Sequence, residues 1–121
     1  MRKLAVVLLV VIASASFAQN PQAVTGSYTG PSESYGLVIE RAPDGTLRGN
    51  YVEMGSVAIL NGIEIRGSEF RARASFDDGT LRVISGSFTN RTRNGRNVFG
   101  LRLHDVPVED LGLVDTFFER L

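Results

Sequence analysis

The stretch Asp44-Gly45-Thr46-Leu47-Arg48 recurs with the same five residues at 78–82. Both copies begin with an Asp-Gly pair, which is typical of tight turns between antiparallel strands because glycine accepts a positive φ without steric cost. Asn61-Gly62 and Asn94-Gly95 are pairs of the same kind, and the series of glycines continues to Gly112 at spacings of 17, 17, 16 and 17 residues. Such a period fits about two strands and two turns. It predicts an antiparallel meander whose hairpin tips recur on one side.

Alternation of apolar and polar residues predicts the strands between these turns. Along 69–76, Phe70, Ala72, Ala74 and Phe76 share one face, as in a half-buried antiparallel strand. The expected strands are 24–30, 35–41, 46–53, 56–60, 63–67, 69–76, 80–89, 96–104 and 113–120. If 63–67 and 69–76 form one bent strand across the intervening Gly-Ser pair, eight strands remain.

The last of these segments, 113–120, has two interpretations. It could be a strand that closes the sheet against the first strand, or part of a helix that begins near Pro107. The strand is favoured, since an unpaired first strand would expose an edge, and natural sheets avoid exposed edges. Residues 105–112 are then expected to form a connecting loop.

Further glycines follow several of the turns, as in Gly49-Asn50-Tyr51, Gly67-Ser68-Glu69-Phe70 and Gly86-Ser87-Phe88. Glycine inside a strand marks a bulge, a sharp bend or a close backbone approach. Bends at similar heights are what a small sheet needs in order to close. The chain is therefore predicted to be all-β, a small antiparallel up-and-down β-barrel of about eight strands. A flattened β-sandwich built from the same hairpins is the alternative.

The first residues, 1–18, have the features of a signal peptide. An Arg-Lys pair precedes an apolar run at 4–13, and the small residue Ala18 stands before the expected cleavage site. The remainder, 19–121, has the size of one domain. It contains no cysteine, which excludes a disulfide framework and thiolate sites. The protein is expected to be exported, to the periplasm or the extracellular space.

The early strand Gly26-Ser27-Tyr28-Thr29-Gly30, followed by Asp-Gly hairpins in an exported chain, resembles small calycin-type barrels. Avidin-like and lipocalin-like proteins are the nearest shapes, and the resemblance covers most of 19–121. It implies a barrel. Because the chain has no tryptophan, and Tyr28 stands where both groups commonly carry one, the resemblance implies no binding residues.

The charge balance and the residue types exclude several kinds of partner and site. Without the Arg-Lys pair near the start, 11 arginines and 13 acidic residues give a net charge of −2, which argues against nucleic acid as a partner. The apolar run is shorter than the roughly 20 residues that a membrane-spanning helix needs, which favours a cleaved signal peptide over an uncleaved anchor. No stable membrane insertion is expected after cleavage. A single histidine, His104, cannot build a histidine metal site. No catalytic residue, metal or cofactor is predicted.

Two groups of residues are candidates for binding. Tyr28, Tyr51 and Phe99 are aromatic residues that could line a ligand cup at an open end of the barrel. Arg91, Arg93 and Arg96 lie on one predicted hairpin and could contact a protein partner or hold phosphate, sulfate or carboxylate in bidentate fashion.

Three functions follow, in this order of preference. The first is a non-enzymatic binding protein for a small or amphipathic ligand. The second is a protein–protein interaction module or envelope inhibitor that uses 91–96 and 105–112 as its contact surface. The third is a barrel enzyme of the isomerase or cyclase kind, in which Glu40 or Tyr51 would point into an apolar cavity.

Overall fold

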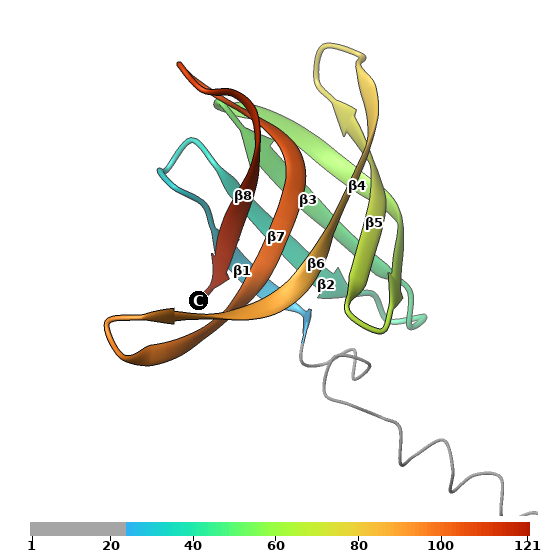
Figure 1. Ribbon diagram of the computed structural model, residues 1–121. Coiled ribbons are helices and arrows are strands. Elements are labelled where there is room, and N and C mark those ends of the chain that lie inside the picture. The colour runs from blue at the N-terminus through green and yellow to red at the C-terminus, as the bar shows by residue number, and fades with distance from the viewer. Residues whose placement is uncertain (1–23) are drawn as a thin grey trace, which may run out of the picture.

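A computed structural model describes residues 24–121, so the expected signal peptide at 1–18 and its cleavage site lie outside the described residues. The described part is a closed antiparallel barrel in which each strand pairs with the next along the chain (Figure 1). This confirms the predicted eight-stranded up-and-down barrel. The strands are β1 (Gly26–Thr29), β2 (Gly36–Arg41), β3 (Leu47–Glu53), β4 (Ser56–Arg66), β5 (Glu69–Phe76), β6 (Leu81–Arg93), β7 (Arg96–Val108) and β8 (Gly112–Arg120).

β8 closes the barrel against β1. The two strands pair at Tyr28↔Arg120 and Thr29↔Glu119, which confirms that the last segment is a strand and not a helix. The predicted loop at 105–112 is wrong in extent, because β7 continues to Val108. A bulge in its pairing with β8 lies between Leu103 and Val106 and lets the strand continue through polar residues.

The Asn61-Gly62 pair is not a hairpin turn. It lies inside β4, where the pairing with β5 shifts register between Asn61 and Glu64. The turn between β4 and β5 falls instead at Gly67-Ser68, so the segments at 56–60 and 63–67 form one strand and the predicted join was wrong. The physical reason is that a left-handed glycine, here with φ of 60°, suits a bulge as well as a turn.

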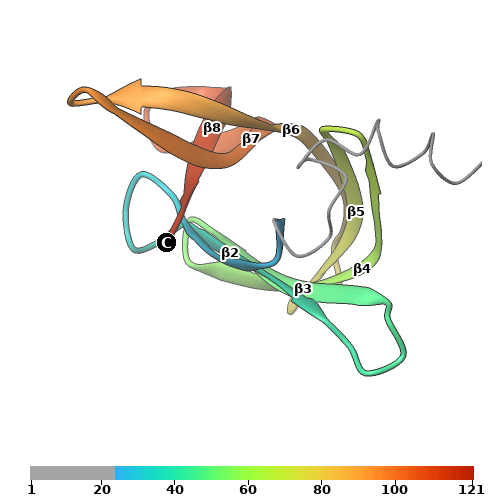
Figure 2. The same cartoon turned by 90° about the horizontal axis from the view of Figure 1, so that it is seen from below.

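The hairpin tips lie at both ends of the barrel, so the prediction that they recur on one side was wrong. Gly45 turns β2 into β3 and Gly95 turns β6 into β7, at one end, whereas Gly79 turns β5 into β6 at the other. The regular glycine spacing does not follow whole hairpins because the strands differ in length, from four to 13 residues. The β6–β7 hairpin projects beyond the barrel wall (Figure 2).

Alternating side chains from all strands fill the barrel. Phe70, Ala72, Ala74 and Phe76 are buried as their spacing predicts. The aromatic rings meet at centroid distances of 5.8–6.3 Å, for example Phe70 edge-on to Phe88. Eight strands leave room for little more than side chains, and this interior is a packed core.

Glycines at three strand positions allow neighbouring backbones to approach closely. A Cβ atom at Gly49 would lie 2.0 Å from the Val38 carbonyl oxygen, and one at Gly86 would lie 2.1 Å from that of Arg102. Gly100 is crowded in the same way. The prediction of close backbone approach within strands is confirmed at these glycines.

Candidate functional site

The predicted aromatic candidates lie in or against the core. Tyr28 and Tyr51 are buried, while Phe99 is half-buried and stacks on Phe88 with the ring centroids 5.8 Å apart. The Tyr28 hydroxyl donates to the Val24 carbonyl oxygen at 2.5 Å, and burial raises the pKa of this tyrosine to about 12. Packing in the core accounts for the positions of all three residues.

Tyr51 belongs to a polar cluster at one end of the core. Its hydroxyl donates to Glu53 Oε1 at 2.8 Å, and Arg82 binds both carboxylate oxygens of Glu53. Burial and the neighbouring Glu53 raise the pKa of Tyr51, and hydrogen bonding to Glu53 raises the pKa of Arg82. Glu40, the other acid–base candidate, is exposed on β2. The cluster is thus a satisfied ion pair that anchors β3 to β6.

The three candidate arginines share one face of the β6–β7 hairpin. The tight turn Asn94-Gly95 has positive φ at both residues, as predicted for this pair, and brings Arg93 directly opposite Arg96. Arg91 lies two residues before Arg93, and side chains two residues apart in a strand point to the same side. We call Arg91, Arg93 and Arg96 the arginine cluster.

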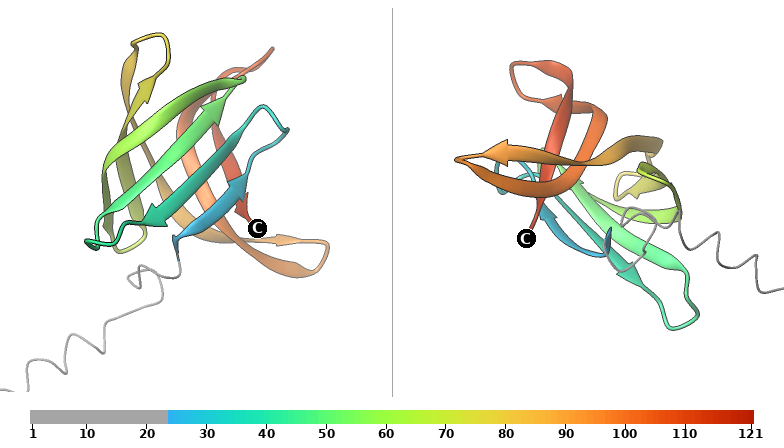
Figure 3. Two further views of the ribbon diagram at one scale, coloured as in Figure 1. Left: turned by 180° about the vertical axis from the view of Figure 1, so that it is seen from behind. Right: turned by 60° about the horizontal axis from the view of Figure 1, so that its bottom comes forward.

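Two of these arginines contact β8. The Arg91 guanidinium lies 4.6 Å from the ring centroid of Phe117, and that ring covers Gly100, where no side chain intervenes. Arg93 forms an ion pair with Glu119. β8 ends beside the base of this hairpin (Figure 3). Arg91 and Arg93 therefore lie against the outer face of β8, and Arg96 lies beside Arg93 on the hairpin.

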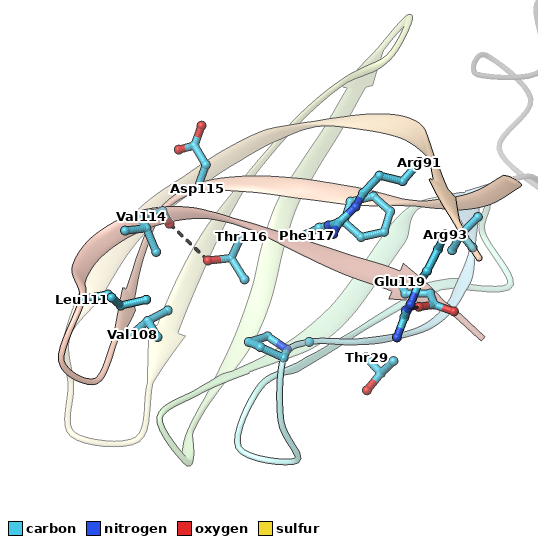
Figure 4. Close-up of a pocket in the computed structure, with 13 residues that line it drawn as sticks. Thr29, Arg91, Arg93, Val108, Leu111, Val114, Asp115, Thr116, Phe117 and Glu119 are labelled. Carbon is cyan, nitrogen blue, oxygen red and sulfur yellow. Dashed lines mark hydrogen bonds and ion pairs between the residues drawn. The ribbon is translucent and has the colours of Figure 1, made fainter. Parts of the chain in front are cut away.

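A groove runs along β8 from the arginine cluster to the loop between β7 and β8 (Figure 4). It has a volume of about 520 Å³. Arg91 and Arg93 line one end and Val108 and Leu111 the other, with β8 between them. Thr29, Gly30 and Pro31 form the wall opposite β8. Basic and apolar groups thus lie at the two ends of one groove.

Asp115 lies midway along the groove and on the outer face of β8. Its Oδ2 is 3.5 Å from Arg102 Nη2 and 3.3 Å from His104 Nδ1. The single histidine is thus an outer-face residue beside a carboxylate. No group of three or more His, Cys, Asp or Glu side chains suited to a metal ion occurs within residues 24–121.

Sequence reasoning identified the arginines but missed the partners of Arg91 and Arg93 on β8, which are Phe117 and Glu119. The alternation in 113–120 contained a usable signal, because adjacent Phe117 and Phe118 cannot both face the interior of a strand. Which ring faces outward depends on the register with β7, where Phe118 lies opposite Leu101.

In the described part of the chain, no helix has the length and apolar character needed to cross a membrane. Comparisons of the sequence and structure with family models, with curated proteins and with solved structures found no match. The function is therefore inferred from the residues, charges and shape of the groove.

Proposed function

We propose that this protein is an exported, non-enzymatic binding module that recognises an acidic, partly apolar segment of another polypeptide. The binding site is the groove along β8. The observation that carries this proposal is the continuity of the groove, which joins Arg91 and Arg93 at one end to Val108 and Leu111 at the other.

The packed interior supports a site outside the barrel. Tyr51, Leu60, Leu101 and Phe118 are fully buried in the centre. A small ligand in the lumen would have to displace side chains that form one cluster of buried residues, and displacement of core groups costs several kcal/mol. An outer groove requires no such rearrangement.

The charge pattern favours an acidic partner. Arg93 and Arg96 lie directly opposite each other, and like charges at such positions repel. With Arg91 they place three positive charges near the single carboxylate of Glu119. Carboxylates of a partner would relieve this excess through forked arginine contacts.

The shape of the site favours a polypeptide segment over a compact ion. A second hollow, of about 340 Å³, shares Pro31 and Val108 with the groove and continues past Met54. Leu111 is 67% exposed and Met54 52% exposed. Exposed apolar side chains around a groove are typical of protein interaction sites.

The proposal is tested by selecting peptides from a random displayed library on the full chain. We expect enriched peptides that combine acidic and apolar residues. Their affinity should fall by about tenfold or more in the Arg91→Ala/Arg93→Ala/Arg96→Ala variant, because hot-spot arginines dominate such contacts. The melting temperature should fall by no more than about 8 °C, because the exposed Arg93–Glu119 ion pair and the Arg91–Phe117 contact together contribute about 1 kcal/mol.

The matched control is Arg48→Ala/Arg66→Ala/Arg71→Ala, which removes the same charge from exposed positions elsewhere. Equal loss of affinity in both variants would show that net charge, and not the groove, holds the peptides. Failure to enrich any peptide would reject the proposal. So would native mass spectrometry of the protein from its own host, if it showed a small adduct that disappears on denaturation.

A further inference from the structure

β8, which lines the groove, lacks a pairing strand along most of one edge. β1 has four residues and β8 has nine, and they pair only at Tyr28↔Arg120 and Thr29↔Glu119. Beyond Thr29 the chain turns away, and the Gly30 N–H donates to the Tyr35 carbonyl oxygen at 3.1 Å. Within residues 24–121, no strand pairs with Gly112–Phe118 on this side.

The backbone groups along this edge have a defined direction. The Leu121 N–H donates to the Ser27 carbonyl oxygen at 2.9 Å, so the backbone groups of Leu121 point toward β1. The direction of these groups alternates along a strand. The N–H and C=O groups of Leu113, Asp115 and Phe117 therefore point into the vacant side, while those of the residues between them point to β7.

The groove lies at this edge rather than on a face of the sheet. Four consecutive residues of β8, 114–117, line it, although successive side chains of a strand point to opposite faces. A hollow bounded by both faces of one strand can only run along its edge. Thr29, Gly30 and Pro31 close the far side and leave a channel between two segments of backbone (Figure 4).

Building on the proposed function, we propose that the partner segment binds by strand addition, as an extended chain antiparallel to β8 and opposite 113–117. This direction continues the line of β1, which is itself antiparallel to β8. Such a segment supplies the hydrogen bonds that the edge lacks, and an unpaired strand edge is a ready template for another chain.

The antiparallel direction of the bound segment predicts which of its residues are acidic and which are apolar. An antiparallel segment begins near Glu119 and ends near Gly112, so its first residues lie beside the arginine cluster and should be acidic. The later residues lie beside Leu111 and Val114 and should be apolar and β-branched. The partner is therefore an extended segment of about five residues with acidic and then apolar character.

The test compares Asp115→Pro with Asp115→Ala, using the tightest peptide from the library selection as the probe. Proline removes the N–H that points to the vacant edge and keeps the bonds to β7, since proline is tolerated on edges. Alanine removes the carboxylate and keeps the N–H. We expect the proline variant to bind the peptide at least about tenfold more weakly than the alanine variant, because the two variants both lack the carboxylate and differ in the N–H.

A loss in the arginine variant together with full binding by Asp115→Pro would overturn strand addition and leave the proposed function intact. Equal losses in both Asp115 variants would overturn it as well, because the side chain would then be the contact. If Asp115→Pro fails to fold, the pair Leu113→Pro and Leu113→Ala makes the same comparison. As a second readout, bound peptide should slow amide exchange at Leu113, Asp115 and Phe117, and unchanged exchange there would contradict the proposal.

Discussion

At the scale of single residues, the two copies of the Asp-Gly-Thr-Leu-Arg repeat form the same turn, but their final arginines have different surroundings. Asp44 accepts from the Thr46 N–H at 3.0 Å and Asp78 from the Thr80 N–H at 2.9 Å. Hydrogen bonding to the side chain of the same threonine, and secondly to these backbone N–H groups, holds the pKa of each aspartate below its usual range. The arginines that follow differ, because Arg82 meets a buried carboxylate.

Removal of Arg82 should destabilise the protein while removal of Arg48 should not. Glu53 has a side chain only 7% exposed, and Arg82→Ala would leave it buried without its cation. Loss of one partner of a buried pair costs about 3–5 kcal/mol, and the 37% exposure of Arg82 reduces the expectation to about 2 kcal/mol. Denaturant unfolding of Arg82→Ala and of the control Arg48→Ala measures the difference. Equal stabilities would show that solvent satisfies Glu53.

A second residue-scale prediction concerns close backbone contact. Gly86→Ala would place a methyl group against the Arg102 carbonyl oxygen, and overpacking of this kind costs about 1–3 kcal/mol or more. Gly36→Ala is the control, because its Cβ would meet the nearest atom, the Tyr28 carbonyl oxygen, at an ordinary 3.6 Å. Thermal unfolding should separate the two variants. A stable Gly86→Ala protein would mean that β6 and β7 can move apart at this point.

At the scale of elements, the two edges of β8 differ in how far they are paired with neighbouring strands. One edge pairs with β7 over most of its length, and the other meets β1 at two positions. The β6–β7 hairpin crosses beside this strand and anchors to it through Arg91 on Phe117 and Arg93 on Glu119. The strand is thus held from one side and left open on the other.

This asymmetry predicts an alternating exchange pattern in the free protein. Amides of Leu113, Asp115 and Phe117 should exchange at least about tenfold faster than those of Thr116 and Phe118, whose N–H groups point to β7. Residue-resolved hydrogen exchange by NMR measures the pattern. Uniform protection along β8 would show that another segment covers the edge.

At the scale of the whole molecule, the barrel encloses a core with ionisable hydroxyls and no wide lumen. Burial raises the pKa of Tyr28 to about 12 and raises that of Tyr51 as well. An unfolded tyrosine has a pKa of about 10. The folded state therefore keeps these protons to higher pH than the unfolded chain does.

Ionisation of Tyr28 therefore couples the stability of the protein to alkaline pH. Because the folded pKa of Tyr28 is raised, its contribution to stability is fully present below about pH 10 and is lost as the pH rises from about 10 toward 12. The melting temperature should fall over this window. The fall should be shallower in Tyr28→Phe, which removes one titrating group. An identical alkaline profile in the wild type and the variant would indicate that Tyr28 ionises without unfolding.

Local sequence determined much of this protein because turns and alternation act over a few residues. The Asp-Gly and Asn94-Gly95 turns, the two-residue alternation of 69–76 and the closing strand at the end were all readable. So was the arginine cluster as a candidate contact. Each of these features depends on the φ preference of a residue or on the direction of its side chain. Both properties are set by the residue and its neighbours in the sequence.

Tertiary structure alone decided the rest, because register and closure are long-range properties. Asn61-Gly62 became a bulge and not a turn only through its pairing with β5. The groove exists because β1 is too short to cover β8 and because the β6–β7 hairpin places Arg91 over Phe117. A one-residue shift in register would exchange Phe117 and Phe118 between the outer face and the core. The proposed binding surface is therefore a consequence of how the barrel closes.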